Sequence, residues 1–443
     1  MYFYCIATFN GVGTFPRSVA TMATAPRSEH PAPPGAERST GTVVWTDRFL
    51  DYTWTPEHPM KPARLKFTMA LAESLGLLDG VELLAPAAAE RADLLRIHTP
   101  AYIDAVEHAV APEGAPLAPP HGLGSPDNPV FPGMHQAASV IVGGTLAAAR
   151  AIAEGRSNRA VSIGGGMHHA MADSAAGFCV YNDAAVAISW LLDHGFDRIA
   201  YLDVDVHHGD GVQRAFYGDP RVLTISLHQH PATLWPNTGW PEETGAGAGE
   251  GSSINLPLLP GTRDAQWLRG FHAVVPGAVA AFRPQIVVSQ CGVDTHREDP
   301  LADLELTVDG QRAAFRAMRD LADHCAEGRW LAVGGGGYGL VRVVPRAWTH
   351  LLATALDRTI APDTAIPQDW IDLVRAAAPQ VDPPRTMGDG GDIDYRPWDG
   401  PGGTGETGDA RLDRAQRAVD TAVLATRRAS FGLLGLDPED PRD

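Results

Sequence analysis

The stretch Ile199-Ala-Tyr-Leu-Asp-Val-Asp-Val-His-His-Gly-Asp-Gly211 begins as an apolar strand and ends in a run of metal-ligand side chains. Because side chains alternate across a β-strand, Asp203, Asp205 and His207 are expected to share one face of it. Carboxylate and imidazole groups at that spacing form a candidate metal site. The alternative is that the carboxylates only cap the following turn. The further histidine and acid in the same run favour the metal site.

On either side of this stretch, strand and helix patterns alternate from residue 159 onwards. Strands are predicted at residues 160–163, 199–206, 222–227, 286–289 and 330–333, and helices at residues 182–193, 264–282, 308–327 and 341–356. Earlier in the chain, a strand is predicted at residues 42–45, helices at 63–78, 88–109 and 133–153, and a Pro- and Gly-rich loop at 112–132. The alternation predicts an α/β fold with a mostly parallel sheet and helices on both faces.

Composition divides the chain into three parts. Residues 1–41 are rich in proline and small polar residues and are predicted to be an irregular leader. Residues 42–357 carry the alternating pattern and form the predicted catalytic domain. Residues 358–443 form a C-terminal extension with an irregular Pro- and Gly-rich segment at 379–408 and a last helix at 411–431.

The net charge of −18 over 443 residues, without a basic stripe, argues against nucleic acid or an anionic membrane surface as a partner. The four cysteines contain no CxxC pair, which favours reduced thiols in a cytoplasmic protein. No continuous apolar run reaches the ~18 residues of a membrane span, and no signal peptide is apparent, so no export is expected. The sequence leaves the oligomeric state open.

Four chemically rich segments each follow a predicted strand directly. They are Gly164-Gly-Gly-Met-His-His169, residues 205–210, Gly292-Val-Asp294 and Gly334-Gly-Gly-Gly-Tyr338. Parallel α/β sheets bind ligands outside the carboxyl ends of their strands. The four segments are therefore expected to converge on one edge. A phosphate-binding loop is the competing interpretation of the glycines, but the GxxxxGK[ST] pattern is absent.

Asp205, His207 and Asp294 would supply two carboxylate oxygens and one imidazole nitrogen to a metal ion. Three protein ligands leave positions open for water and substrate, as a hydrolytic site requires. Zinc fits this set, and its oxygen-rich character also accommodates iron(II), cobalt or manganese.

Proton transfer near neutral pH is the chemistry expected of His168 and His169. Asp203 and Asp210 are the natural partners to orient the two rings, because they lie in the strand-end segment. The Tyr338 hydroxyl could stabilise an oxyanion that develops on a substrate carbonyl. The alternative for Tyr338 is that it only packs after the glycine run.

These motifs resemble those of the zinc-dependent histone deacetylases and their bacterial relatives of the acetoin-utilisation (AcuC) type. The matching stretches are His58-Pro-Met-Lys-Pro-Ala-Arg64, Gly164-Gly-Gly-Met-His-His169, Gly177-Phe-Cys-Val-Tyr-Asn-Asp183, Asp203-Val-Asp-Val-His-His-Gly-Asp-Gly211, Cys291-Gly-Val-Asp294 with Asp299-Pro300, and Gly334-Gly-Gly-Gly-Tyr338. The likeness runs from residue 42 to residue 356. It implies a single arginase-like α/β domain that hydrolyses an acyl-lysine amide.

The resemblance also implies a role for each matching residue. Zinc would bind Asp205, His207 and Asp294. His169, paired with Asp210, would act as general base and then general acid, whereas His168, paired with Asp203, would act mainly through its charge. Tyr338 would polarise the acetyl carbonyl. A structural potassium ion would bind at Asp203, Asp205, His207, Ser226 and Leu227.

The substrate tunnel is implied in the same way. Gly177, Phe178 and Trp235 would grip the lysine stem, with Met167 and Leu301 nearby. Trp235 stands where many relatives have phenylalanine. Asp127 would hold the substrate backbone at the rim, and Arg64 would lie behind the active site where acetate leaves. The implied substrate is an acetylated protein, for which an acyl-CoA synthetase is one candidate.

Three other functions share parts of this pattern. A binuclear manganese ureohydrolase needs a further carboxylate where this sequence has Gly209. An inactive acyl-lysine reader predicts loss of Tyr338 or of a histidine, and none is lost. An acetylpolyamine amidohydrolase would use the same metal, histidines and tyrosine, so the sequence leaves that alternative open.

Overall fold

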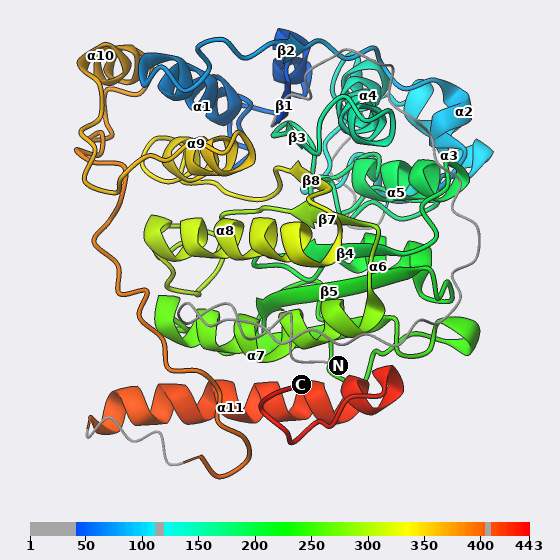
Figure 1. Cartoon of the computed structure of the whole chain (residues 1–443). Coiled ribbons are helices and arrows are strands. Elements are labelled where there is room, and N and C mark those ends of the chain that lie inside the picture. The colour runs from blue at the N-terminus through cyan, green and yellow to red at the C-terminus, as the bar shows by residue number, and fades with distance from the viewer. Residues whose placement is uncertain (1–40, 111–118, 404–408) are drawn as a thin grey trace.

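The computed structural model of the protein describes residues 41–110, 119–403 and 409–443. The predicted leader therefore lies outside the described residues except for Gly41, as does part of the predicted loop at 112–132. In the described ranges, eight strands form one sheet in the order β2-β1-β3-β8-β7-β4-β5-β6 (Figure 1). All neighbouring strands are parallel. The predicted α/β class with a mostly parallel sheet is confirmed.

The central strands are buried on both faces, as expected for a parallel sheet covered by helices. The strands are β1 (Thr42–Val44), β2 (Leu83–Leu84), β3 (Arg159–Ser162), β4 (Ile199–Asp203), β5 (Val222–Gln229), β6 (Ser253–Leu258), β7 (Ile286–Gln290) and β8 (Trp330–Val333). Every residue of β4, β5, β7 and β8 is buried. Their Val, Ile and Leu side chains therefore form the centre of the core.

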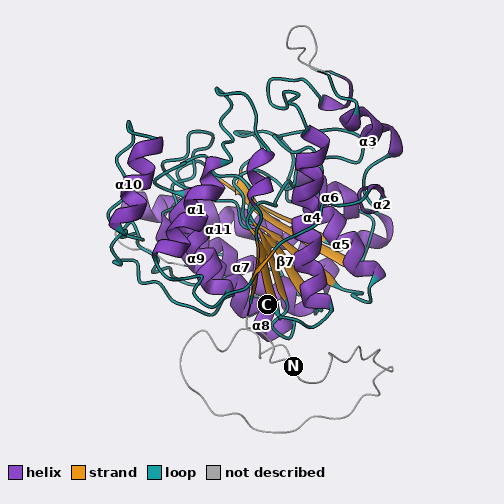
Figure 2. Ribbon diagram, turned by 90° about the horizontal axis from the view of Figure 1, so that it is seen from above, coloured by secondary structure: helices purple, strands orange, loops and turns teal. Residues whose placement is uncertain are grey.

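Helices cover the two faces of the sheet (Figure 2). One layer contains α2 (Arg91–Leu94), α3 (Pro100–Glu107), α4 (Met134–Ala153), α5 (Asp183–Asp193) and α6 (Asp210–Phe216). The other contains α1 (Ala63–Ser74), α7 (Asp264–Phe282), α8 (Val308–Cys325) and α9 (Val344–Ala355). Such a double cover leaves the carboxyl ends of the strands open for a ligand.

Among the described helices, α4 alone is long and apolar enough to cross a membrane, with a hydropathy of 1.3. However, 78% of its apolar window is buried inside the protein. It packs against α5, β1 and β3. Its composition is that of a core helix.

The strand that carries the central motif is shorter than predicted. β4 ends at Asp203 rather than at residue 206, so Asp205 and His207 lie in the loop that follows. Two side chains interrupt the ladder: Asp203 Oδ1 accepts from Asp205 N at 3.2 Å, and Asp205 Oδ1 accepts from His207 N at 3.0 Å. Such local bonds compete with strand pairing. The predicted end of this strand at residue 206 was therefore wrong, although Val204 N still donates to Gln290 O and Val206 O still accepts from Gln229 N.

Other element boundaries also differ from the prediction. The predicted helix at 88–109 is two helices, because Thr99 caps α3 through Tyr102 N and Pro100 occupies its first turn. The predicted helix at 63–78 ends at Ser74, and that at 341–356 begins at Val344. The sequence analysis missed four elements: β2, β6, α6 and α10 (Gln368–Ala377).

The C-terminal extension packs along the catalytic domain (Figure 1). α10 packs against α1, where Trp370 Nε1 donates to Phe67 O. Residues 379–403 contain no helix or strand, in agreement with the predicted irregular segment. α11 (Ala410–Ser430) packs against α7 and the edge strand β6. Thr426 Oγ1 donates to Asn255 O of β6, so α11 satisfies part of that exposed edge.

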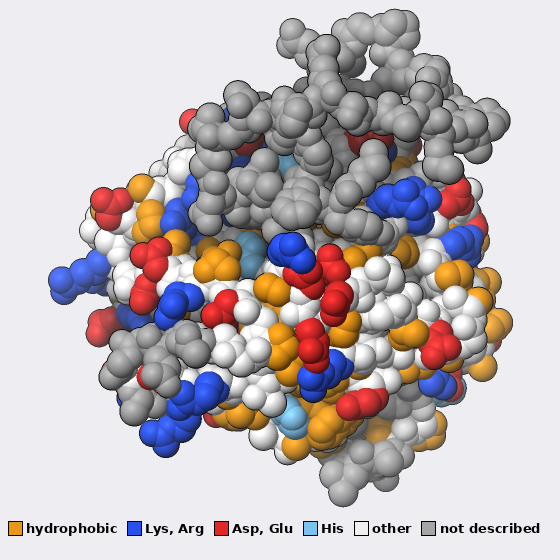
Figure 3. Space-filling view, turned by 60° about the horizontal axis from the view of Figure 1, so that its bottom comes forward, with side chains coloured by type: hydrophobic (Ala, Val, Ile, Leu, Met, Phe, Trp, Pro, Cys, Tyr) orange, Lys and Arg blue, Asp and Glu red, His pale blue; other side chains and the backbone are white. Residues whose placement is uncertain are grey.

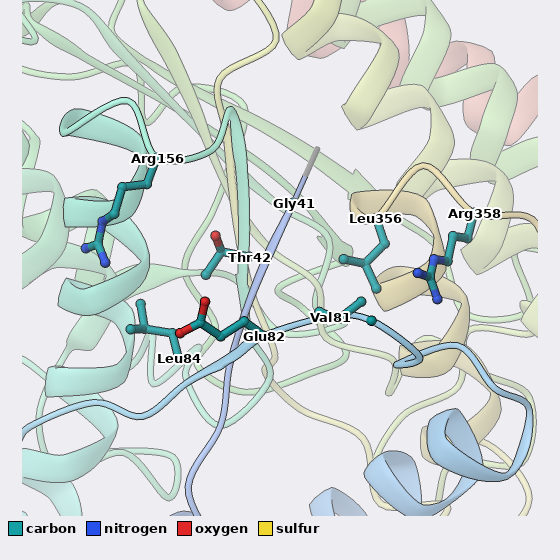
Figure 4. A pocket seen from close by; sticks show the side chains of 9 residues that line it. Gly41, Thr42, Val81, Glu82, Leu84, Arg156, Leu356 and Arg358 are labelled. Atoms are coloured by element: carbon teal, nitrogen blue, oxygen red, sulfur yellow. The ribbon is translucent and has the colours of Figure 1, made fainter. Parts of the chain in front are cut away.

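Acidic and basic side chains are interspersed on the face shown in Figure 3. A separate cavity lies at the amino ends of β1 and β2, away from the carboxyl ends of the strands (Figure 4). Arg156 and Arg358 lie on opposite sides of it, with Glu82 between them. None of the predicted site residues lines this cavity.

One buried cation joins the end of the chain to the domain. Arg427 of α11 is 1% exposed and donates to four backbone carbonyls, those of Ala273, Asp437, Pro438 and Asp440. Its guanidinium also lies over the rings of Phe431 and Trp398 at 4.2 and 4.5 Å. The next residue, Arg428, is exposed and pairs only with Glu439.

We therefore expect Arg427→Met to lower the free energy of unfolding by about 3 kcal/mol, because it leaves the buried Ala273 carbonyl and three part-buried carbonyls without this donor. The control Arg428→Met removes a surface ion pair and should change that free energy by less than about 1 kcal/mol. Urea unfolding followed by circular dichroism measures both. Equal losses in the two variants would contradict this account of Arg427.

Candidate metal centre and active site

The strands β3, β4, β7 and β8, which precede the four chemically rich segments, end at the same level. Asp203 of β4 pairs in register with Gln290 of β7, Gln290 with Val333 of β8, and Val333 with Ser162 of β3. The loops that leave these strands therefore start side by side on one edge of the sheet. The predicted convergence of the four segments follows from this register.

Asp205, His207 and Asp294 form a cluster in which one ligand atom from each lies within 4.8 Å of the others. His207 Nδ1 lies 3.1 Å from Asp205 Oδ1 and 3.2 Å from Asp294 Oδ2. Both carboxylates are buried, with exposures of 1% and 0%. Two oxygens and one nitrogen thus face one point.

Neighbouring amides hold the carboxylates in place. Asp205 Oδ2 accepts from Gln290 Nε2 and from Gly336 N, both at 2.7 Å. Asp294 Oδ1 accepts from Val206 N at 2.8 Å. Each carboxylate keeps its other oxygen directed at His207. Partners of this kind orient metal ligands in proteins.

Glycines allow the loops to approach the cluster closely. A Cβ on Gly336 would lie 2.0 Å from Asp294 Oδ2, and a Cβ on Gly292 would lie 2.2 Å from Asp205 Oδ2. Both distances are shorter than any non-bonded contact. The glycine runs are therefore needed for backbone approach to the carboxylates, and not for binding phosphate.

The charge of the cluster fits a divalent cation. Burial raises the pKa of Asp294 to about 6, and the adjacent charge of Asp205 adds to the rise. Two ionised carboxylates this close together are unfavourable in a buried site unless a cation neutralises them. The donor set of Asp205, His207 and Asp294 therefore fits the predicted metal.

Two histidine–aspartate pairs lie beside this cluster. His168 Nδ1 donates to Asp203 Oδ2 at 2.8 Å, and His169 Nδ1 donates to Asp210 Oδ1 at 2.7 Å. The pairs are those that the sequence analysis expects. Because each Nδ1–H faces a carboxylate, Nε2 of the neutral ring is left as the proton acceptor. The two ring centroids are 3.9 Å apart.

The two rings differ in charge: one is protonated and the other is neutral near neutral pH. For His168, burial lowers the pKa, but the charges of Asp203 and Asp205 outweigh it and raise the pKa to about 9. For His169, burial and the positive charge of His168 lower the pKa to about 4. Near neutral pH His169 is the free base, and His168 is the charged ring.

The Tyr338 hydroxyl forms no hydrogen bond with any residue in the described ranges, although the ring lines the site. Burial, together with the charge of Asp294, raises the pKa of Tyr338 well above its usual value. The hydroxyl therefore keeps its proton. Its backbone is held by Asp299 Oδ2, which accepts from Tyr338 N at 2.8 Å.

A small cavity connects these groups. Its walls are Met60, Gly166, Met167, His168, His169, Gly177, Phe178, Cys179, Asp205, His207, Gly335, Gly336 and Tyr338. Predicted metal ligands, proton-transfer residues and tunnel residues thus share one space. Met60 and Cys179 were not predicted, although both lie inside motifs that the sequence analysis singled out.

Trp235 stands over this cavity. Its ring centroid is 4.6 Å from that of His169 and 6.3 Å from that of His207. The side chain is 42% exposed, so it forms an outer wall. Gly177 lies against both rings: a Cβ there would be 2.5 Å from His169 Cδ2 and 2.7 Å from the Trp235 ring, so only glycine leaves room.

The remaining predicted residues lie around the cavity rather than in its wall. Asp127 is exposed, and its carbonyl accepts from His58 Nε2 at 3.2 Å. The His58 ring in turn contacts Phe178 with centroids 4.4 Å apart. Leu301 is half-buried, and its N–H donates to Asp299.

Arg64 is buried behind Tyr338. Its Nη1 donates to Gly337 O at 2.9 Å, and the guanidinium lies 5.1 Å from the Trp348 ring and 6.0 Å from the Tyr338 ring. The arginine therefore contacts both the Tyr338 ring and the glycine that precedes it.

Two of the five predicted potassium ligands are neighbours in the sheet. Ser226 of β5 pairs in register with Asp203 of β4. Because His228 Nε2 donates to Gly239 O, its Nδ1 accepts from the Ser226 hydroxyl at 2.8 Å. This leaves a lone pair of Ser226 Oγ available to a cation.

The metal assignment gives the first prediction from this site. Asp294→Ala removes one of three ligands, so the purified variant should lose its bound metal while it stays folded. Elemental analysis and circular dichroism measure the two properties. Asp372→Ala, which changes an exposed acid on α10, is the control and should retain the metal. One equivalent of metal in Asp294→Ala would refute the ligand set.

Comparison with known proteins agrees with this geometry. The sequence profile of the histone deacetylase domain matches residues 58–355. The acetoin utilization protein AcuC of Bacillus subtilis (strain 168) is 40% identical over 329 residues, which cover 74% of this chain and 84% of that protein. AcuC of Staphylococcus aureus (strain MSSA476) is 36% identical over 345 residues, or 77% of this chain and 88% of that protein.

Solved structures show the same architecture. A crystal structure of a histone deacetylase (HDAC) homolog complexed with SAHA has a TM-score of 0.74 and 28% identity, and covers 87% of this chain and 100% of that chain. A crystal structure of an HDAC homolog from Aquifex aeolicus has a TM-score of 0.71, also at 28% identity, and covers 86% of this chain and 99% of that one. With the profile match over residues 58–355 and the AcuC relatives, these similarities show that the chain belongs to the histone deacetylase family and is an AcuC-type deacetylase.

Proposed function

We propose that this deacetylase hydrolyses the amide bond of acetyl-lysine side chains in proteins. The observation that carries the proposal is the shared cavity, which is lined by Asp205 and His207 of the three-ligand cluster, by the neutral His169 and by Tyr338. An acetyl-lysine side chain presents a carbonyl and an amide nitrogen at the end of an apolar stem. Those groups need an electrophile, a base and an oxyanion donor at the bottom of an apolar channel.

Asp205, His207 and Asp294 would hold the metal, for which we propose zinc. Iron(II) or cobalt would also suit two oxygens and one nitrogen. When bound, the metal would polarise the acetyl carbonyl and acidify water. We further propose a structural potassium ion beside Asp203 and Ser226.

His169 would move the protons. Its Nε2 accepts a proton from the water that attacks the carbonyl carbon. As the carbon–nitrogen bond breaks, the same ring gives that proton to the leaving lysine nitrogen, which departs as a neutral amine. Asp210 keeps Nδ1–H in place through both steps. His168 stays charged and acts by its field, because its pKa lies well above neutral pH.

Tyr338 would stabilise the oxyanion. Its hydroxyl is protonated and has no other partner in the described ranges, so it can donate to the carbonyl oxygen as charge develops there. Such a donor acts more strongly on the transition state than on the bound substrate. This preference separates a hydrolase from a protein that only binds acyl-lysine.

The walls suit a methylene stem. Gly177, Phe178 and Trp235 enclose the outer part of the cavity, with Met167 deeper in it and Leu301 nearby. Asp127 would hold the substrate backbone at the rim. Arg64 would line the path by which acetate leaves. We further propose an acyl-CoA synthetase as one candidate protein substrate.

The roles of the two histidines can be ranked by substitution. His169→Ala should lower kcat for an acetyl-lysine peptide by ~10²-fold or more across the pH range, because it removes the proton carrier. His168→Ala should lower kcat less and mainly shift the pH profile. Steady-state kinetics between pH 6 and pH 9, on metal-loaded protein, measure both. A reversed ranking would mean that the two roles are exchanged.

Tyr338→Phe tests the oxyanion donor. The change keeps the ring and the glycine turn, so metal content and folding should be retained, whereas kcat should fall by ~10²–10³-fold. Peptide affinity, measured by calorimetry, should stay within severalfold of the original value. Tyr395→Phe, which alters a half-buried tyrosine of the C-terminal extension, is the matched control. Near-normal kcat in Tyr338→Phe would show that the tyrosine only packs.

A further inference from the structure

The wall residue Trp235 lies on a loop between β5 and β6 whose position the strands do not fix directly. Its turn is closed by Asn237, whose Nδ2 donates to Pro231 O and Leu234 O. Those bonds shape the turn but do not attach it to the domain. Gln229 Nε2 of β5 donates to Thr233 Oγ1 at 3.2 Å and so attaches the start of the loop. The residues that follow Asn237 attach its other side.

Three buried or half-buried side chains hold that following segment. Glu243 Oε1 accepts from Gly239 N at 2.8 Å and from Trp240 N at 3.0 Å. His208 Nδ1 accepts from Thr238 Oγ1 at 2.8 Å. In addition, His228 Nε2 donates to Gly239 O at 2.9 Å. Residues 238–240 are thus held from three directions.

Two of these contacts, those of Glu243 and His208, lead to Gln213 of α6. Its Nε2 donates to Glu243 Oε2 at 2.8 Å. Its Oε1 accepts from Ser253 Oγ and Asn255 Nδ2, both at 2.8 Å, and from His208 Nε2 at 3.0 Å. Gln213 is buried and both polar atoms of its amide are hydrogen-bonded, whereas Asn255 Oδ1 has no partner in the described residues. Buried amide bonds of this kind favour one arrangement of the Gln213 side chain.

α6 also carries the partner of the catalytic base. Its first residue is Asp210, which orients His169, and Gln213 lies one turn later on the same helix. The helix therefore connects the orientation of His169 to the position of the Trp235 loop. The helix α6 thus sets the position of Trp235 relative to His169.

We propose that Glu243, anchored through Gln213, is a positioning residue that places Trp235 against the substrate stem over His169. It touches neither the substrate nor the reacting atoms. The proposal rests on the proposed function, because it assumes that Trp235 grips an acyl-lysine stem. It adds a determinant of substrate affinity that lies outside the cavity.

The adjacent residue provides a matched control. Glu242 is exposed, and its carboxylate forms no hydrogen bond or ion pair with any residue in the described part of the chain. Glu242→Gln and Glu243→Gln change charge and shape identically. Only Glu243→Gln sets an amide NH2 against the backbone N–H groups of Gly239 and Trp240 or against the Gln213 amide.

The first measurement does not depend on activity. Hydrogen–deuterium exchange of the metal-loaded full chain should be faster in Glu243→Gln than in Glu242→Gln for the peptide containing residues 234–240. Peptides from β5 and β6 should exchange as before. Unchanged exchange at residues 234–240 would overturn the proposal that Glu243 holds this loop, whether or not the protein hydrolyses acetyl-lysine.

The second measurement is a double-mutant cycle with Trp235→Ala on an acetyl-lysine peptide. Glu243→Gln alone should raise KM about tenfold, whereas in the Trp235→Ala background it should change KM by less than about twofold. Equal effects in both backgrounds would overturn the proposal, because Glu243 would then act independently of Trp235. If Glu243→Gln does not fold, Thr238→Val, which removes only the contact with His208, should show the same non-additivity with a smaller effect. A wild-type protein that binds metal but leaves the peptide intact refutes the proposed function separately.

Discussion

The burial of two carboxylates beside one imidazole is the constraint on which the site depends. Asp205 and Asp294 are almost wholly buried, and their ligand atoms lie within 4.8 Å of His207. Two negative charges at that separation in a buried site require a cation, strong hydrogen bonds or both. The surrounding amides of Gln290, Gly336 and Val206 supply hydrogen bonds to the outer oxygens, and the inner oxygens are left for a metal. Glycine is needed at Gly292 and Gly336 because a Cβ there would meet the carboxylate of Asp205 or Asp294.

The same surplus of negative charge gives the neighbouring histidines different tasks. His168 lies closer to the buried carboxylates, which raise its pKa to about 9. The charged His168 then contributes to the low pKa of His169, about 4, whose own carboxylate, Asp210, is partly exposed. In the proposed hydrolysis the neutral ring would act as the base, and the charged ring would act through its field. Electrostatics and not sequence order thus separates two adjacent residues of the same type.

Much of the fold and of the site could be predicted from the sequence. The strands β3, β4, β7 and β8 read as short apolar runs, and each is followed by glycines or ligand residues, so their convergence follows from parallel topology. The end of β4 could not be predicted from periodicity, because Asp203 and Asp205 replace ladder bonds with local turns. β6 and α6 were missed because their patterns are short. The Gln213 and Glu243 network was missed for another reason: isolated polar residues show no pairing in sequence, and only the fold brings them together.

The central claim is that the cavity serves acetyl-lysine in proteins, and a comparison of two substrates tests it most directly. The metal-loaded full chain would be assayed for acetate release from an acetyl-lysine peptide and from acetylputrescine under the same conditions. Because the rim at Asp127 and the wall at Trp235 would contact peptide beyond the reacting group, kcat/KM should be at least about tenfold higher for the peptide, which corresponds to ~1.4 kcal/mol. A preference of the same size for acetylputrescine, or no release of acetate from the peptide, would contradict the account.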